Sequence, residues 1–291
     1  MPRFCVNLSF LFGDRPFQER FDAAARAGFR AVELHFPYEF DKAVLAECAG
    51  RAGVAVVLFN LPPGDWAKGE RGIACHPDRV DEFRDGVGLA LEYALALDCG
   101  TLNCLLGVPP PDADESAVHE SVVANLRFAA DALAAHGRTL VIEPLNTRTV
   151  PGFYVTSSKG AAQLVREVGA PNLKIQYDLF HMQIMEGDLA KTLEALLPMI
   201  GHVQFADVPD RHEPGTGEIN FDFLFGWLDR LGYAGWVGAE YQPSRTTEQT
   251  LAWTRRWLAP LPRQQQTTPA AREASGQRLA SEQQQQEETG R

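Results

Sequence analysis

The chain has 291 residues, of which 45% are hydrophobic and 22% are charged, a composition typical of a globular protein with material for a sizeable core. Its formal net charge of −11 argues against a protein that binds nucleic acid mainly through the phosphates. The same acidity would repel a small anionic substrate, so such a substrate would need a local cation in its binding site.

The cysteines and the N-terminal segment indicate the expected compartment. The five cysteines form no CxxC pair and no Cys/His finger spacing, so reduced thiols in a cytoplasmic protein are expected. The apolar stretch 4–12 is interrupted by Asn7 and Ser9 and is followed by charged residues, which is unlike a signal peptide. No apolar run has the length needed to cross a bilayer, so we expect no membrane partner.

Segments typical of strands alternate with segments typical of helices along most of the chain, which favours a parallel sheet with crossover helices. In the first helical segment, Phe17, Phe21, Ala24 and Ala25 share one apolar face. The predicted strands cover residues 4–9, 31–36, 54–60, 101–107, 140–142, 173–178, 201–205 and 236–240. Further predicted helices include 41–52, 80–97, one from residue 115, one from about residue 187, 222–231 and one that ends near residue 258. Eight such units predict an α/β fold, a single (β/α)8 TIM barrel.

The composition changes abruptly after Pro262. Residues 263–291 contain two short glutamine runs and almost no bulky apolar side chains, so this segment cannot bury enough surface to offset the entropy lost on ordering. We therefore expect a catalytic barrel at 1–262 and a Gln-rich disordered tail at 263–291. A helical extension is the alternative, but the segment lacks a heptad repeat.

Four successive predicted strands each carry an oxygen-bearing side chain at or near the C-terminal end. Glu143 follows an apolar run, Asp178 ends LKIQYD, Gln204 lies in GHVQF, and Glu240 ends WVGAE. The C-terminal ends of barrel strands form the active-site face, and hard cations such as Mg²⁺ or Mn²⁺ prefer oxygen ligands. Each residue alone could equally be an ion-pair or helix-capping residue. Their repetition on consecutive strands predicts a divalent-metal site.

Other polar residues near the predicted strand ends are candidates for binding a substrate. His181 follows Asp178 by three residues and could orient a substrate hydroxyl or hydrogen-bond to a metal-ligating residue. Arg211 lies in a Pro- and Gly-rich loop and Arg71 lies in GERGIACHP, and either could pair with a substrate carboxylate. Exposure to solvent is the alternative for these three side chains. Candidates within or at the ends of strands, for which hydrogen bonding in the core is equally consistent, are Asn7, Asn103, Glu33, His35 and Asn60.

Five segments together resemble the hydroxypyruvate isomerase family, which includes the 2-oxo-tetronate isomerases and belongs to the xylose isomerase-like TIM barrels. They are NLPPGDWAKGERGIACHP, VIEPLNTRTVPGF, QYDLFHMQIMEGDL, HVQFADVPDRHEPGTGEINF and GAEYQP. The resemblance implies that the chain isomerises a short hydroxy-keto acid without an organic cofactor, converting hydroxypyruvate to 2-hydroxy-3-oxopropanoate. The two proton-transferring glutamates of the family fall on Glu143 and Glu240. The divalent-metal ligands of the superfamily fall on Glu143, Asp178, Gln204 and Glu240, and Gln204 is a weaker, neutral ligand where the superfamily has histidine.

This chemistry is consistent with the residues. Moving a carbonyl by one carbon requires a proton to leave C3 and another to arrive at C2 through an enediolate, and a pair of carboxylates can make both transfers. A divalent cation, Mg²⁺ or Mn²⁺, would stabilise the enediolate charge. The sequence has no P-loop and no GxGxxG after a strand, which fits the expectation that no organic cofactor is used.

Two other functions on the same barrel remain as alternatives. A divalent-metal-dependent ketose 3-epimerase would share the fold, the metal and the paired glutamates, although the two arginine-bearing loops favour an acid substrate. A DNA repair enzyme of the endonuclease IV type would need extra histidines for three zinc ions and a basic surface. Seven histidines and a net charge of −11 argue against it. A homo-oligomer is compatible with the sequence, which does not decide between a three- and a four-carbon substrate.

Overall fold

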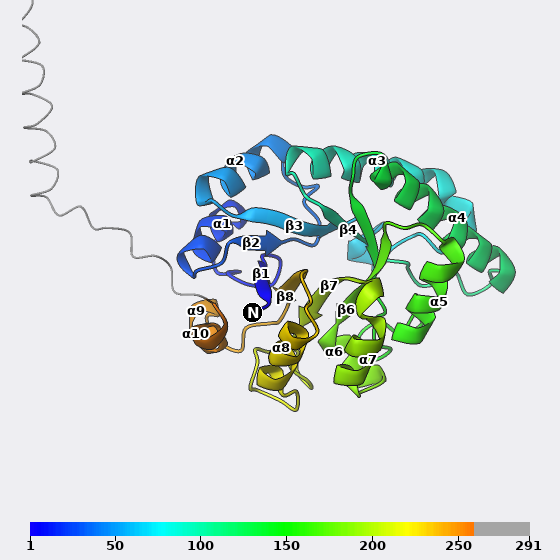
Figure 1. The fold of residues 1–291 in the computed structure, drawn as a ribbon. Helices are drawn as coiled ribbons and strands as arrows, with labels where there is room; N and C mark the ends of the chain where they lie inside the picture. Colours follow the sequence, from blue (N-terminus) through cyan, green and yellow to red (C-terminus); the bar gives the residue numbers. More distant parts are fainter. Residues whose placement is uncertain (259–291) are drawn as a thin grey trace, which may run out of the picture. The chain divides into compact units, whose positions relative to one another are not determined.

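The structure is a computed structural model and describes residues 1–258. The predicted tail 263–291, and the predicted boundary after residue 262, lie outside the described residues. Eight parallel strands close into one barrel, in which each strand pairs with its sequence neighbours and β1 pairs with β8 (Figure 1). The strands are β1 (Arg3–Asn7), β2 (Ala31–Glu33), β3 (Ala55–Asn60), β4 (Thr101–Cys104), β5 (Thr139–Ile142), β6 (Leu173–Asp178), β7 (Ile200–Phe205) and β8 (Trp236–Ala239). The predicted (β/α)8 barrel is confirmed.

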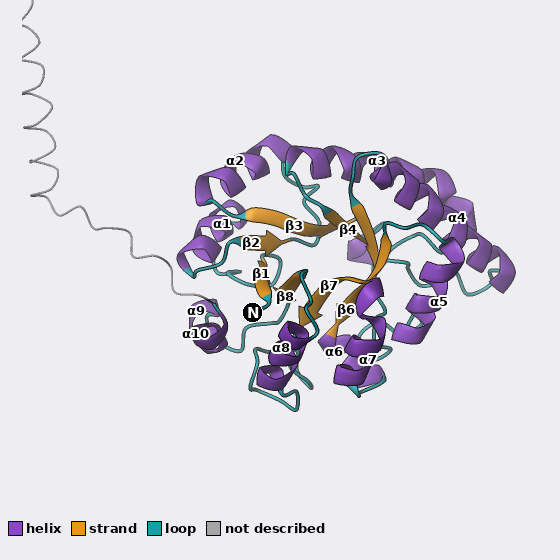
Figure 2. Cartoon of the chain, in the orientation of Figure 1, coloured by secondary structure: helices purple, strands orange, loops and turns teal. Residues whose placement is uncertain are grey.

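Helices surround this barrel on the outside (Figure 2). Because the strands face helices on one side and the barrel interior on the other, they are buried on both faces and read as apolar runs in the sequence. The helices are α1 (Phe17–Arg26), α2 (Lys42–Ala52), α3 (Val80–Ala96), α4 (Glu115–Ala134), α5 (Ser158–Val168), α6 (Leu179–Met185), α7 (Leu189–Leu196), α8 (Phe221–Arg230), α9 (Thr247–Thr250) and α10 (Thr254–Trp257). Short 3₁₀ turns are η1 (Trp66–Lys68), η2 (Pro77–Arg79), η3 (Leu197–Met199) and η4 (Leu251–Trp253).

Helix α6 was not predicted from the sequence, because the first helix after the sixth strand was expected to begin near Gly187. Asp178 ends β6 and also caps α6, because its Oδ1 accepts a hydrogen bond from the backbone N–H of Phe180 at 2.8 Å. The strand passes directly into the helix at Asp178, so the sequence has no separate turn residues between them that would indicate where the helix begins. The helix expected near Gly187 is α7.

Several strands also end earlier than predicted. β2 ends at Glu33 and β4 at Cys104, whereas the apolar runs continue for about three further residues. Buried apolar residues such as Leu34 and Leu105 follow these strands outside the ladder. Apolar residues in a sequence indicate burial but not strand pairing, so the predicted strands extend beyond the hydrogen-bonded part.

The inner face of the barrel carries buried polar side chains toward the C-terminal ends of the strands. Hydrogen bonds join Glu33 of β2 to His202 of β7, so side chains from different strands meet inside the barrel. The two-residue period of a strand places Gln176 on the same face as Asp178, and His202 on the same face as Gln204. This polar layer forms the floor of the site described below.

Two further features concern sulfur chemistry and membranes. All five cysteines lie within the described residues and are buried free thiols. Among residues 1–258, no helix has both the length and the apolar character needed to cross a membrane.

Candidate active site

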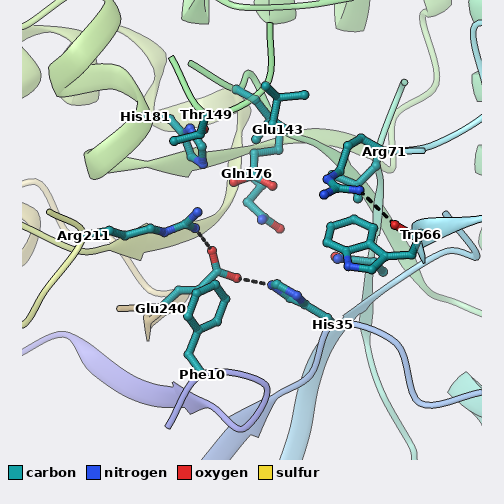
Figure 3. Close-up of a pocket in the computed structure, with 14 residues that line it drawn as sticks. Phe10, His35, Trp66, Arg71, Glu143, Thr149, Gln176, His181, Arg211 and Glu240 are labelled. Carbon is teal, nitrogen blue, oxygen red and sulfur yellow. Dashed lines mark hydrogen bonds and ion pairs between the residues drawn. The ribbon is translucent and has the colours of Figure 1, made fainter. Parts of the chain in front are cut away.

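A cavity of about 220 Å³ opens at the C-terminal ends of the strands. Seven of the residues predicted as candidates from the sequence line it: Glu143, Glu240, His181, Arg71, Arg211, His35 and Asn60. All of these except Asn60 are labelled in Figure 3. The other lining residues are Phe10, Trp66, Leu105, Leu145, Thr149, Val150 and Gln176.

Two carboxylates and a histidine form a tight group on one side of the cavity. Glu143, which directly follows β5, accepts a hydrogen bond from Asn103 Nδ2 at 3.2 Å through Oε2. Within the described residues, neither Glu143 Oε1 nor Asp178 Oδ2 has a hydrogen-bond partner, although both atoms are buried. Ligand atoms of Glu143, Asp178 and His181 lie within 4.8 Å of one another. Unpaired buried oxygens are uncommon and indicate that a partner belongs there.

Burial and like charge shift the pKa of these two carboxyl groups in the same direction. Burial raises the pKa of Glu143 well above its usual range, and the carboxylates of Glu240 and Asp178 raise it further. Burial also raises the pKa of Asp178 to about 7, against the opposing effect of the Arg211 guanidinium. Without a cation, both groups therefore favour the protonated form at a higher pH than free carboxyls do.

His181 lies in the first turn of α6, and its ring is held in one tautomer. Its Nδ1 accepts a hydrogen bond from the backbone N–H of Asn146 at 3.0 Å. Burial, reinforced by the positive charge of Arg211, lowers the pKa of His181 well below its usual range. The neutral ring therefore carries its proton on Nε2, which lies 3.6 Å from Asp178 Oδ2. His181 offers the cavity a neutral N–H donor.

Glu240 follows β8 and is surrounded by donors. Its Oε1 accepts hydrogen bonds from Asn7 Nδ2 at 2.8 Å and Gln204 Nε2 at 3.0 Å. His35 Nε2 lies 3.0 Å from the same oxygen, and the Arg211 guanidinium pairs with Oε2 (Figure 3). Burial acts to raise the pKa of Glu240, but Arg211 and His35 outweigh it and lower the pKa to about 2. Glu143 and Glu240 are thus pushed toward opposite protonation states, a pattern associated with acid/base pairs.

The loop between β7 and α8 carries Arg211 into the cavity. The buried carboxylate of Asp207 holds this loop by accepting hydrogen bonds from the backbone N–H groups of Gly215, Gly217 and Ile219, at 3.0, 2.8 and 3.0 Å. A Cβ atom at Gly217 would lie 1.7 Å from the carbonyl oxygen of Val208, so only glycine permits this close approach.

The guanidinium of Arg211 contacts two aromatic rings and two carboxylates. It lies 5.0 Å from the ring centroids of both Phe10 and Phe180. It pairs with Glu240 and lies 3.6 Å from Asp178 Oδ2. Arg211 therefore neutralises carboxylates that belong to the site itself.

Arg71 enters the cavity from the opposite side (Figure 3). Its guanidinium lies 3.7 Å from the centroid of the Trp66 ring, and NH1 donates to the carbonyl of Glu70 at 2.8 Å. Gly72 fixes the next backbone unit against the end of β4, because a Cβ atom there would lie 1.9 Å from the carbonyl oxygen of Leu105. Within residues 1–258, Arg71 has no carboxylate partner, unlike Arg211.

The remaining predicted residues are buried beside the cavity instead of lining it. Asn7 and Asn103 are fully buried, and each donates to one of the two glutamates, Asn7 to Glu240 and Asn103 to Glu143. Gln204 turns its amide N–H groups toward Glu240, while its Oε1 accepts from Gln176 Nε2 at 2.6 Å. These three side chains hold other residues of the site in place.

Sequence reasoning did not single out Gln176, Trp66 or Phe10. Gln176 could have been found, because it precedes Asp178 by two residues and so shares its inward face. Trp66 lies in the same loop as Arg71, although its contact with that arginine is a tertiary feature. Nothing in the sequence around Phe10 indicates a place at the cavity.

The donor set suits a divalent cation. Glu143 and Asp178 lie with His181 at metal-ligand spacing and each keep an unpaired buried oxygen, and Glu240 lies close enough to raise the pKa of both carboxyl groups. Oxygen-rich sites of this kind are preferred by Mg²⁺ and Mn²⁺. The residues present therefore fit a resident divalent cation.

Comparisons with known proteins decide the family. The model of the family described as xylose isomerase-like TIM barrel matches residues 21–259. The chain is 49% identical over 253 residues to the hydroxypyruvate isomerase of Escherichia coli (strain K12), which covers 87% of this chain and 98% of that protein. The chain belongs to the xylose isomerase-like TIM barrel family. It is also 46% identical over 258 residues to the 2-oxo-tetronate isomerase of Cupriavidus necator, which covers 89% of this chain and 99% of that protein.

Within the xylose isomerase-like barrels, the chain groups with the hydroxypyruvate and 2-oxo-tetronate isomerases and is an isomerase. A solved structure from Brucella melitensis, described as an AP endonuclease of family 2, is 50% identical with a TM-score of 0.87 and covers 89% of this chain and all of that chain. The resemblance predicted from the five sequence segments is confirmed.

Proposed function

We propose that this isomerase interconverts hydroxypyruvate and 2-hydroxy-3-oxopropanoate (tartronate semialdehyde), or the corresponding four-carbon 2-oxo acids. The observation that carries the proposal is the small cavity in which two glutamates of opposite pKa shift face Arg71, an arginine with no carboxylate partner among residues 1–258. The names of the two bacterial relatives support the same class of substrate.

Arg71 is the group proposed to bind the substrate carboxylate. A guanidinium and a carboxylate form a bidentate, charge-assisted pair, and Arg71 is the cavity arginine that is free to make one within the described residues. With the carboxylate there, the hydroxy-keto end would extend toward Glu143, His181 and Glu240. A ketose has no carboxylate and would leave Arg71 unpaired, so this residue favours an acid over an epimerase substrate.

The opposite pKa shifts of the two glutamates support the assignment of Glu240 as the base and Glu143 as the acid. Glu240, ionised and fixed by four donors, would take the proton from C3, and the electrons of that C–H bond would form the C2–C3 double bond of the enediolate. Glu143, whose raised pKa favours the protonated form, would deliver a proton to C2 while the proton of the C3 hydroxyl passes to the C2 oxygen, so that C3 becomes the carbonyl and C2 carries the hydroxyl. The proton on Glu240 and the proton lost by Glu143 would be restored by exchange with solvent before the next turnover. His181 Nε2–H would hold a substrate oxygen.

We further propose that Glu143, Asp178 and Glu240 hold a divalent cation, Mg²⁺ or Mn²⁺. When bound, such a cation would supply positive charge for the enediolate oxygens. Gln204, the fourth ligand proposed from the sequence, would join them only with its amide turned, because its oxygen faces Gln176.

Removing or adding the cation is expected to change thermal stability in a pH-dependent way. The pKa of Asp178 is raised to about 7 from an ordinary value near 3.8, so below about pH 7 the folded state holds a proton that the unfolded chain has released. The metal-free protein should therefore lose stability as pH rises through this window. A cation replaces that proton, so Mn²⁺ should raise the Tm at about pH 8 and change it little at about pH 5. Thermal denaturation with EDTA and with Mn²⁺ measures both effects. Equal shifts at the two pH values would contradict a site built on these carboxyls.

Proton NMR of hydroxypyruvate in D₂O tests the proposed function. We expect 2-hydroxy-3-oxopropanoate to appear with deuterium on its carbon skeleton, because the transferred proton exchanges with solvent on a carboxyl group. If only a four-carbon 2-oxo acid is converted, the proposed type of reaction stands and the substrate has four carbons. Conversion of a free ketose to its C3 epimer, with no reaction of either acid, would replace the proposal with the epimerase function.

A further inference from the structure

Glu33 is a buried carboxylate that the proposed reaction does not use. It ends β2, is fully buried, and does not line the cavity. Its Oε1 accepts hydrogen bonds from Gln204 Nε2 at 2.7 Å and Asn7 Nδ2 at 3.1 Å. Its Oε2 lies 2.6 Å from His202 Nε2 and 3.5 Å from the Cys5 thiol. The two amides and the thiol all donate to this carboxyl group, and the two amides share one of its oxygens.

Two of these donors are shared with Glu240. The amide of Asn7 and the amide of Gln204 each touch Glu33 Oε1 and also Glu240 Oε1, the latter at 2.8 and 3.0 Å. An amide NH₂ group has two hydrogens, so each amide can give one to each carboxylate. The carboxyl groups of Glu33 and Glu240 are thereby held side by side. Turning either amide over would bring its carbonyl oxygen against two carboxylates, so Glu33 fixes which end of each amide faces Glu240.

The barrel makes room for this carboxylate. A Cβ atom at Gly238 of β8 would lie 2.3 Å from Glu33 Oε2, so a larger residue there would displace it. A buried charge is weak evidence for stability, because apolar residues of similar volume usually pack at least as well. A carboxylate kept in this place, next to the group that takes the proton, therefore calls for an explanation other than packing.

We propose that Glu33 is a positioning residue, which holds the N–H groups of Asn7 and Gln204 on Glu240 and so fixes the carboxylate that takes the proton. The inference rests on the proposed function insofar as Glu240 is the base. Glu33 touches neither substrate nor cavity and acts only through the two amides.

Two substitutions of Glu33 separate orientation from charge. In Glu33→Gln, the new amide oxygen can still accept from Asn7 and Gln204, while its NH₂ group faces His202 Nε2, which accepts in one of the two ring tautomers. In Glu33→Leu, both acceptors are lost and the two amides are free to turn. We expect Glu33→Leu to lower kcat about tenfold or more with KM unchanged, and Glu33→Gln to stay within about threefold of the native enzyme. Cys5→Ala removes only the weakest contact of Glu33 and serves as the matched control, with unchanged kcat.

A native kcat in Glu33→Leu, or equal losses in both Glu33 variants, would overturn the proposal.

Gly238→Ala provides a second test if Glu33→Leu does not fold. It displaces the Glu33 carboxylate while keeping every polar group, and it should lower kcat in the same way. Crystal structures of the variants need no substrate, so they decide the inference even if hydroxypyruvate is not turned over. Unmoved Asn7, Gln204 and Glu240 side chains in Glu33→Leu, or in Gly238→Ala, would overturn it. Failure of the native enzyme to convert any 2-oxo acid would instead overturn the proposed function.

Discussion

Glu143→Gln and Glu240→Gln are each expected to lower turnover of hydroxypyruvate by roughly 10³-fold, because each removes one of the two proton-transferring groups. The two variants should differ in stability. Burial raises the pKa of Glu143 so that it favours the neutral form, and a glutamine resembles that form closely. At Glu240, the new NH₂ group would take the place either of Oε1, which accepts from Asn7 and Gln204, or of Oε2, which pairs with Arg211, so it would face a donor in both orientations. We therefore expect an unchanged Tm for Glu143→Gln and a lower Tm for Glu240→Gln.

Isotope exchange distinguishes the roles of the two glutamates. In Glu143→Gln, Glu240 can still take the proton from C3 and return a deuteron, so hydroxypyruvate recovered from D₂O should carry deuterium at C3. In Glu240→Gln, this exchange should be lost. The reverse pattern would exchange the two roles, and near-normal turnover by either variant would rule out a mechanism based on this pair.

The sequence predicts the position of the site better than its internal contacts. The C-terminal ends of neighbouring parallel strands must lie side by side, so Glu143, Asp178, Gln204 and Glu240 are placed together by topology alone. Which atoms of Gln204 face Glu240 depends on Glu33, which lies on a distant strand in the sequence. No local pattern encodes such a contact.

The roles of Asn7 and Asn103 show the same limit. Their positions in strands predict inward-facing polar side chains, and both are buried inside the barrel. Whether such a side chain reaches a substrate or a neighbouring glutamate depends on how far the cavity extends down the barrel. That depth is set by packing against all eight strands, so the sequence leaves both readings open.

The two loop arginines were equivalent in the sequence, and tertiary contacts separate them. Asp207 and the backbone around it place Arg211 against Glu240, whereas Gly72 and Trp66 hold Arg71 across the cavity, where no carboxylate of residues 1–258 pairs with it. In an acidic protein, with a net charge of −11, a cation that has no carboxylate partner among the described residues is suited to binding an anion, which supports the role proposed for Arg71.

Arg71→Ala is accordingly expected to raise KM for hydroxypyruvate roughly 100-fold with kcat nearly unchanged, which corresponds to the loss of about 3 kcal/mol from one charge-assisted, bidentate pair. The carboxylate is bound equally in the ground state and the transition state, because the reaction leaves it unaltered, and uniform binding of this kind affects KM and not kcat. Steady-state kinetics with hydroxypyruvate and with a neutral hydroxy-ketone of similar size, such as dihydroxyacetone, measures the effect. The neutral compound should show no change in KM.

Arg211→Ala is the matched control, because it removes the other arginine from the same cavity. Arg211 is the main group that holds the pKa of Glu240 down to about 2 against burial. Its loss should raise the pKa of Glu240. The acidic limb of the pH–rate profile, where the rate falls because Glu240 becomes protonated, should therefore move to higher pH than in the native enzyme. We also expect kcat to fall by a larger factor than KM rises. A raised KM in Arg211→Ala with a native KM in Arg71→Ala would place the substrate carboxylate on Arg211 and reverse the direction in which the substrate lies. Native KM values in both variants would mean that neither arginine binds the carboxylate, and the preference for an acid over a ketose would lose its structural basis.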